Sequence, residues 1–212
     1  MKVAVLVVLF GVTAGVTASD APPAEPKPDP NGPSTDPKDL PLELAIINET
    51  EEYDLDTLGD PSEKYRKRIR EAELSGERLP ASRVEMQLQI TNKGTSAIQI
   101  MVEGNAVELS LELTGNEVMS ARAKSPPQGS VPTRIVTIAP GKSYRMPLTD
   151  LACGKMNQEV YWYLTDFGHH FLTAKLKTAV LPAPRGTKIV EKGFGQITLK
   201  SARLEFRAVR PS

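Results

Sequence analysis

The two histidines of the chain are adjacent, at His169 and His170, and Asp166 lies close before them. Imidazole nitrogens and carboxylates are ligands that Zn²⁺ accepts, so this group raises the question of a metal site. The surrounding residues predict a β-strand, in which adjacent side chains point to opposite faces. We therefore expect one histidine in the core and one at the surface, with no metal and no other cofactor bound.

Cys153 is the only cysteine, so it cannot form an internal disulfide. With His169 or His170 it could in principle form a nucleophile and base. Thiolate catalysis also needs an orienting third group and an oxyanion site, and the residues around Cys153 contain no such motif. A Gly-x-Ser-x-Gly elbow is missing from the sequence as well. We expect Cys153 to be a small, partly buried hydrophobe and expect no catalytic residues.

An acidic segment gives a weaker indication of a calcium site. Asp54, Asp56 and Asp60 faintly resemble a calcium loop, but Leu58 and Tyr65 stand where an EF-hand has oxygen ligands. A looser calcium site stays open beside the favoured interpretation, a solvated acidic turn.

Residues 64–70 carry five basic side chains, but neighbouring acids can pair with them at i,i+4, as in Glu63–Lys67 and Lys67–Glu71. A solvated helix face is the favoured interpretation. The whole chain has 26 basic and 26 acidic residues. Because phosphate-binding surfaces need a basic excess, this balance argues against a nucleic-acid partner.

Residues 161–180 hold the only tryptophan and two of the five tyrosines, and they predict two strands joined at residues 166–168. Strand alternation puts Tyr161, Tyr163 and Phe171 on one face. Aromatic side chains on a sheet face can bind sugars or partner proteins, or can be covered by the helix or a second sheet. These three residues are the candidate binding surface. The opposite face is the predicted core seam: Trp162, Leu164, His170, Leu172, Ala174 and Leu176.

The rest of the chain predicts the frame for these residues. Apolar residues alternate with polar ones from Val84 to Ile90 and in several later segments, as in strands with one buried face. One surface helix is expected over about 61–75, with Asp60 as N-cap and Gly76 as its stop. A change of parity predicts a β-bulge near Ser201. Eight to ten short strands and one helix indicate an antiparallel Greek-key, immunoglobulin-like β-sandwich.

The N-terminus predicts export. Lys2 precedes an uncharged, mostly apolar run over 3–18 that ends in Val-Thr-Ala, so residues 1–18 read as a signal peptide cut between Ala18 and Ser19. The run is shorter than the ~20 residues that span a bilayer, so no membrane segment is expected after cleavage. Residues 19–40 contain seven prolines and no aromatic residue, which indicates a disordered linker. Residues 41–212 form the predicted sandwich domain.

Residues 168–174, Gly-His-His-Phe-Leu-Thr-Ala, resemble the Gly-x-Tyr-x-Leu-x-Ala strand of immunoglobulin-like sandwiches, with His170 in the place of the corner tyrosine. Together with residues 92–94, 139–143 and 195–209, they give residues 82–210 a resemblance to bacterial exported immunoglobulin-like domains, including the intracellular proteinase inhibitor type. The resemblance implies the fold, and inhibition belongs to only some of those relatives.

These observations together predict an exported, non-enzymatic binding or scaffold domain at the cell envelope. Its partner would be a protein or another envelope component. Whether it is periplasmic or secreted, and its oligomeric state, stay open. The alternatives are a proteinase-inhibitor-like domain acting through a loop such as residues 125–133, and a thiol hydrolase using Cys153.

Overall fold

The computed structural model of the chain describes residues 40–123, 131–155 and 158–211. The chain divides into two units, residues 1–32 and 33–212, and every described residue belongs to the second. The predicted signal peptide, with its cleavage site between Ala18 and Ser19, and nearly all of the predicted linker lie outside the described residues. No helix in the described ranges is long and apolar enough to cross a membrane.

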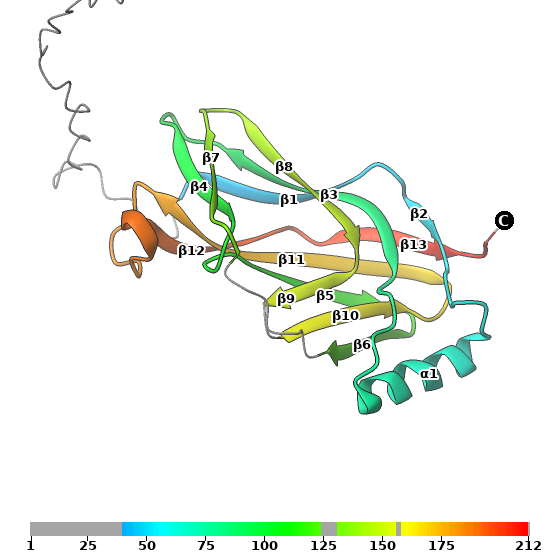
Figure 1. Cartoon of the computed structure of the whole chain (residues 1–212). Coiled ribbons are helices and arrows are strands. Elements are labelled where there is room, and N and C mark those ends of the chain that lie inside the picture. The colour runs from blue at the N-terminus through cyan, green and yellow to red at the C-terminus, as the bar shows by residue number, and fades with distance from the viewer. Residues whose placement is uncertain (1–39, 124–130, 156–157, 212) are drawn as a thin grey trace, which may run out of the picture. The chain divides into compact units, whose positions relative to one another are not determined.

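A three-stranded antiparallel sheet forms one layer of the domain (Figure 1). Its strands lie in the order β1 (Leu42–Asn48), β3 (Arg83–Asn92) and β8 (Ser143–Asp150). In β3 every second side chain is buried, as the alternation of Val84, Met86, Leu88 and Ile90 predicted.

The second layer is a wider sheet centred on the long strand β11 (Gly168–Leu181). All its pairings are antiparallel except that of β13 with β2. Its main path runs β2-β13-β11-β5-β9-β10-β6; β12 and β4 also pair with β11, and β7 pairs with β4. The bounds are β2 (Glu52–Asp54), β4 (Ile98–Glu103), β5 (Glu108–Gly115), β6 (Val118–Ala123), β7 (Arg134–Ile138), β9 (Ala152–Lys155), β10 (Gln158–Leu164), β12 (Gly195–Lys200) and β13 (Leu204–Val209).

The predicted class, a mainly antiparallel β-sandwich with one α-helix, is confirmed for the described residues. They contain thirteen strands rather than eight to ten. The additional strands include short ones such as β2 and β9, which have too few residues to show an alternation of apolar and polar side chains. A single large hydrophobic core contains the inward side chains of both sheets, among them Ile90, Ile100 and Leu172.

The two sheets are joined at one corner by backbone hydrogen bonds. Leu151, which separates β8 of one sheet from β9 of the other, donates its N–H to Ser82 and accepts one from Trp162. Ser82 in turn donates to the carbonyl of Trp162. The chain therefore passes from one sheet to the other at Leu151 without leaving backbone groups unpaired.

The predicted bulge near Ser201 is wrong in form, although the change of parity is real. β12 and β13 are separate strands that pair with successive parts of β11, with residues 201–203 between them. Ser201 bridges the interruption: its N–H donates to the carbonyl of Ala174, and its hydroxyl accepts the N–H of Ala174. The side chain thus replaces one ladder hydrogen bond lost at the break.

The helix α1 (Ser62–Ser75) lies beside β6 at the end of the wide sheet (Figure 1). Its N-cap is Pro61, not the predicted Asp60, and no side chain caps it. Gly76 ends it in the left-handed conformation, as expected. Tyr65, Ile69 and Ala72 are its buried residues. This narrow apolar stripe covers the outward face of β6 and β10.

Candidate functional site

The core seam predicted in residues 161–180 is largely confirmed. Leu164, His170, Leu172, Ala174 and Leu176 are at most 2% exposed, and they face the narrow sheet. Trp162 is the exception, because it is only partly buried against this core.

The candidate binding surface is wrong for one of its three residues. Tyr163 does lie on the predicted outward face, but α1 covers it, and it is 2% exposed. Its ring meets that of Tyr65 edge-on at a centroid distance of 6.4 Å, and its hydroxyl donates to the carbonyl of Leu79 at 3.1 Å. Burial raises the pKa of Tyr163. Tyr163 and the buried residues of α1 thus form a second, smaller hydrophobic core.

Phe171 and Tyr161 remain partly exposed, but they do not form one patch. The strands β5 and β9 separate β11 from β10, which puts the two side chains about 14 Å apart across the sheet at ordinary strand spacing. The guanidinium of Arg203 covers the Phe171 ring at 4.4 Å. Phe171 is therefore a cation–π partner within the chain, whereas Tyr161 lies beside a surface hollow.

The Tyr161 hollow has a volume of about 610 Å³. Four segments build it: the connection after α1, the start of β3, the turn from β8 to β9, and β10. The sandwich brings these segments together at the same corner where the chain changes sheets. Its wall combines an aromatic ring, small apolar side chains and charges of both signs: Pro80, Ala81, Arg83, Thr149, Asp150, Ala152, Glu159 and Tyr161.

Both carboxylates of the Tyr161 hollow, and the hydroxyl of Tyr161, already have partners within the chain. Glu159 accepts a hydrogen bond from the Tyr161 hydroxyl and lies 3.5 Å from the guanidinium of Arg78. Asp150 accepts the N–H of Ala152 at 3.0 Å. Burial and the carboxylate of Glu159 raise the pKa of Tyr161 to about 12, so its hydroxyl stays protonated at neutral pH. The hollow therefore offers a ring and a charged rim whose two carboxylates are already engaged within the chain.

The residues of the Tyr161 hollow other than Tyr161 were not predicted from the sequence. Pro80, Asp150 and Glu159 stand far apart in the chain and carry no motif. The sequence pointed to this site only through Tyr161, which strand alternation placed on the outward face of the sheet.

The two histidines point to opposite faces, as predicted. His169 is exposed and lies 2.6 Å from a carboxylate oxygen of Glu205, whereas His170 is fully buried against Phe206. No group of three or more His, Cys, Asp or Glu side chains in the described parts of the chain could hold a metal ion.

Cys153 is not brought near either histidine. Its neighbour Gly154 pairs with Leu109 of β5, whereas His170 pairs with Gly115 of the same strand. Six residues of a strand span roughly 20 Å, which is far beyond proton-transfer distance. The thiol contacts the Leu111 carbonyl at 4.0 Å, and burial raises its pKa. This arrangement disfavours the thiol hydrolase alternative.

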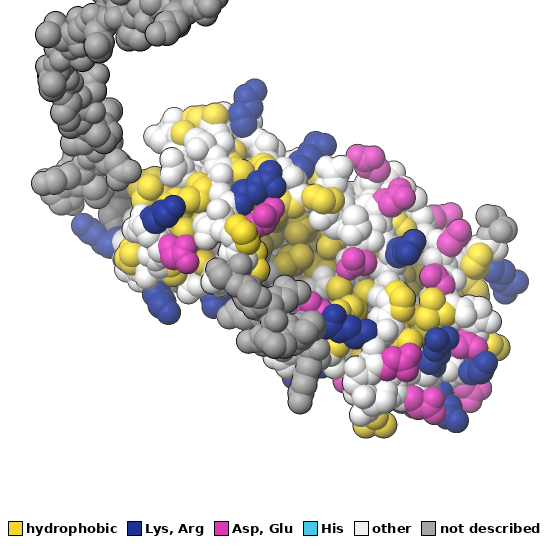
Figure 2. All heavy atoms as spheres, in the orientation of Figure 1, with side chains coloured by type: hydrophobic (Ala, Val, Ile, Leu, Met, Phe, Trp, Pro, Cys, Tyr) yellow, Lys and Arg dark blue, Asp and Glu magenta, His cyan; other side chains and the backbone are white. Residues whose placement is uncertain are grey.

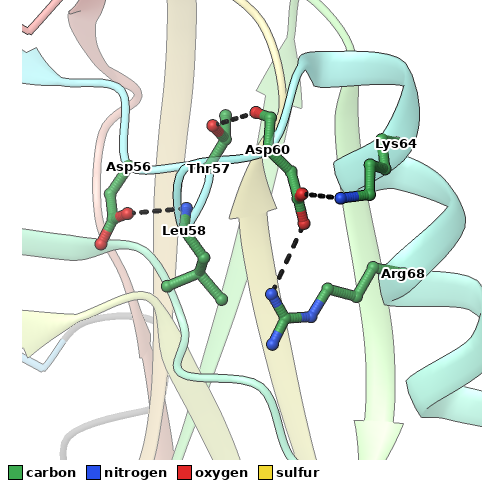
Figure 3. Close-up of polar contacts among 6 residues, drawn as sticks. All are labelled: Asp56, Thr57, Leu58, Asp60, Lys64 and Arg68. Atoms are coloured by element: carbon green, nitrogen blue, oxygen red, sulfur yellow. Dashed lines mark hydrogen bonds and ion pairs between the residues drawn. The ribbon is translucent and has the colours of Figure 1, made fainter.

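The acidic segment before α1 is held together by its own chain (Figure 3). The carboxylate of Asp60 binds Lys64 at 2.6 Å and Arg68 at 3.5 Å, and the hydrogen bond from Lys64 is the main reason that its pKa is lowered. Asp56 accepts the N–H of Leu58 at 2.9 Å. Asp60 therefore anchors two helix side chains instead of capping the helix.

The basic side chains of α1 are also interspersed with acids, as the solvated-face interpretation predicted. Arg66 pairs with Glu117 and Lys67 with Glu71. Figure 2 shows basic and acidic side chains mixed over this end of the molecule. These ion pairs offset part of the basic charge on the described helix.

Comparison with known proteins identifies no family. No family model matches the chain, and no curated protein matches it at a significant level.

Among solved structures, the ASH/PapD-like domain of human CEP192 (PapD-like domain 7) aligns over 92% of this chain and 99% of its own, at 10% identity and a TM-score of 0.26. A structure titled "AvmM Catalyzes Macrocyclization in Alchivemycin A Biosynthesis" aligns over 82% and 92%, at 13% identity and a TM-score of 0.29. Scores this low carry no argument, so the fold assignment rests on the strand pairing described above. The resemblance to proteinase-inhibitor-type domains stays a prediction.

Proposed function

We propose that this chain is an exported, non-enzymatic binding or scaffold domain that acts at the cell envelope, and that it contacts a partner protein through the Tyr161 hollow. The observation that carries the binding site is the hollow itself, in which a partly exposed tyrosine lies among small apolar and oppositely charged side chains. Tyrosine is enriched at protein interfaces because its ring supplies apolar area and its hydroxyl tolerates water. The predicted signal peptide and linker motivate export and tethering.

A protein partner is favoured over a sugar. Sugar recognition depends on side chains whose hydrogen-bonding groups are free to meet hydroxyls, whereas Asp150 and Glu159 are already bound within the chain. A partner surface with an apolar centre and a charged rim fits the hollow better.

The proposal predicts that the Tyr161 ring is needed for capture of the partner. Tagged mature protein carrying Tyr161→Ser is compared with wild type and with Phe171→Ser, the matched aromatic on the same sheet face, in capture from an envelope extract. A protein captured by wild type and Phe171→Ser but at least tenfold less by Tyr161→Ser supports the site. Equal capture by all three proteins removes the hollow from the proposal.

Proteinase inhibition is the alternative within the same broad class. Most of its expected loop, residues 125–133, lies outside the described residues. Titration of the mature protein against serine, cysteine, aspartic and metalloproteases tests it, and no inhibition of any of them would exclude it.

A further inference from the structure

His170 is a buried ionisable side chain that the polar groups around it serve poorly. It is 0% exposed, and neither of its ring nitrogens has a hydrogen-bond partner of ordinary geometry in the described part of the chain. Buried polar groups are normally satisfied, so an orphaned ring that can take up a proton is unusual. An ionised form at this position would lack both water and a countercharge in direct contact.

The surroundings of His170 are mostly apolar and closely packed. Its ring packs on Phe206 of β13 at a centroid distance of 5.7 Å, and Phe206 meets Tyr53 of β2 edge-on at the same distance. On the β5 side, a Cβ built on Gly115 would lie 2.9 Å from the Nδ1 atom of His170, so the backbones approach closely. The corner formed by β11, β13, β2 and the end of β5 is therefore packed around a neutral ring.

Few charged groups face this ring. Asp166, in the turn before β11, is the acidic residue that acts on the pKa of His170. Its carboxylate accepts a hydrogen bond from the N–H of Phe167. His169 projects to the opposite face and pairs with Glu205. From β2, Tyr53 is the titratable group, and its hydroxyl donates to Asn48. Burial lowers the pKa of His170, and the backbone and charge of Asp166 oppose this only in part.

We propose that protonation of His170 loosens the β11–β13–β2 corner and so makes this part of the domain acid-sensitive. The unfolded chain takes up a proton at the ordinary histidine value near 6.5, whereas the packed corner resists it until a lower pH. The contribution of His170 to stability is thus fully present above about pH 6.5. It is lost as the pH falls below that value.

Denaturant unfolding of the mature protein between pH 7.5 and 5.0 tests this inference. His170→Phe keeps an aromatic ring against Phe206 but cannot titrate, and His169→Gln is the surface control. Relative to His170→Phe, the unfolding equilibrium constant of wild type and of His169→Gln should rise by up to about tenfold per pH unit below 6.5. An identical pH dependence in wild type and His170→Phe would overturn the proposal.

A second measurement keeps the test decisive if His170→Phe does not fold. The ring resonances of His170 in the wild-type protein are followed by NMR with falling pH, together with amide exchange in β13 and β2. Retention of the neutral ring well below pH 6.5, followed by faster exchange in β13 and β2 than in β1 and β3, supports the inference. Titration near 6.5 with the exchange in β13 and β2 unchanged contradicts it.

Discussion

At the scale of the residue, the same side-chain type has opposite roles at neighbouring positions. Tyr161 and Tyr163 lie two residues apart on one face of β10, yet only Tyr161 reaches a surface hollow, while Tyr163 is enclosed by α1. His169 and His170 divide in the same way, between a surface contact with Glu205 and the core. Strand alternation explains the histidines, whereas the tyrosines are distinguished only by what covers the sheet.

The buried hydroxyl of Tyr163 gives a prediction at this scale. Tyr163→Phe leaves the carbonyl of Leu79 without its donor, so we expect the free energy of unfolding to fall by about 1 kcal/mol. The matched change, Tyr161→Phe, alters a surface contact and should stay within about 0.5 kcal/mol of wild type. Urea unfolding at pH 7.5 measures both. Equal effects of the two changes would show that α1 does not enclose Tyr163.

At the scale of the element, α1 is a cover for the outer face of the wide sheet. The sheet is amphipathic over the first part of β11 but carries apolar side chains on both faces at β10 and β6, so this end of the sheet needs a second covering element. Tyr65, Ile69 and Ala72 supply that cover from one stripe of the helix. The paired charges around Asp60, Lys64 and Arg68 hold the first turns of the helix together.

Truncation of the helix stripe should show its role. Ile69 is 0% exposed, and Ile69→Ala should lower the free energy of unfolding by about 3 kcal/mol because it removes packed methylenes and leaves a cavity. Leu74, on the same helix, is 88% exposed, and Leu74→Ala should cost less than about 0.5 kcal/mol. Thermal or urea unfolding compares the two. A small loss for Ile69→Ala would mean that α1 packs only loosely on the sheet.

The sequence predicted the elements better than their contacts. Alternation placed Leu172, Ala174 and Leu176 on the core side, and a glycine stop ended α1, because these patterns are local. The burial of Tyr163 depends on Leu79, 84 positions away, and the Tyr161 hollow on four separate segments. No period or motif in the sequence predicts contacts between such distant segments, so the candidate surface was right in its strand parity but wrong in the exposure of Tyr163.

At the scale of the whole molecule, the described domain is a sandwich without internal disulfides whose two sheets meet where the chain crosses at Leu151. The Tyr161 hollow opens at the same corner, so residues of both sheets and of the connection between α1 and β3 form its walls. A site built on such paired segments holds its shape better than one on a long loop. This rigidity suits a binding or scaffold role.

Export gives a prediction at this scale. If residues 1–18 are a cleaved signal peptide, the protein recovered from the envelope or medium of the producing cell begins at Ser19. Intact-mass measurement of that protein, with N-terminal sequencing as the control, gives the answer directly. A mature chain that still carries Met1 and remains in the cytoplasm would contradict export.

The most direct test of the proposed function is site-specific cross-linking in living cells. A photo-reactive phenylalanine analogue is placed at Tyr161 in the full-length chain, and the same analogue is placed at Phe171 as the matched control. The proposed function predicts a discrete cross-linked protein from position 161, and none or far less from position 171. Equal cross-linking from both positions, or none from 161 in cells where the protein is exported, would contradict a partner site at the Tyr161 hollow.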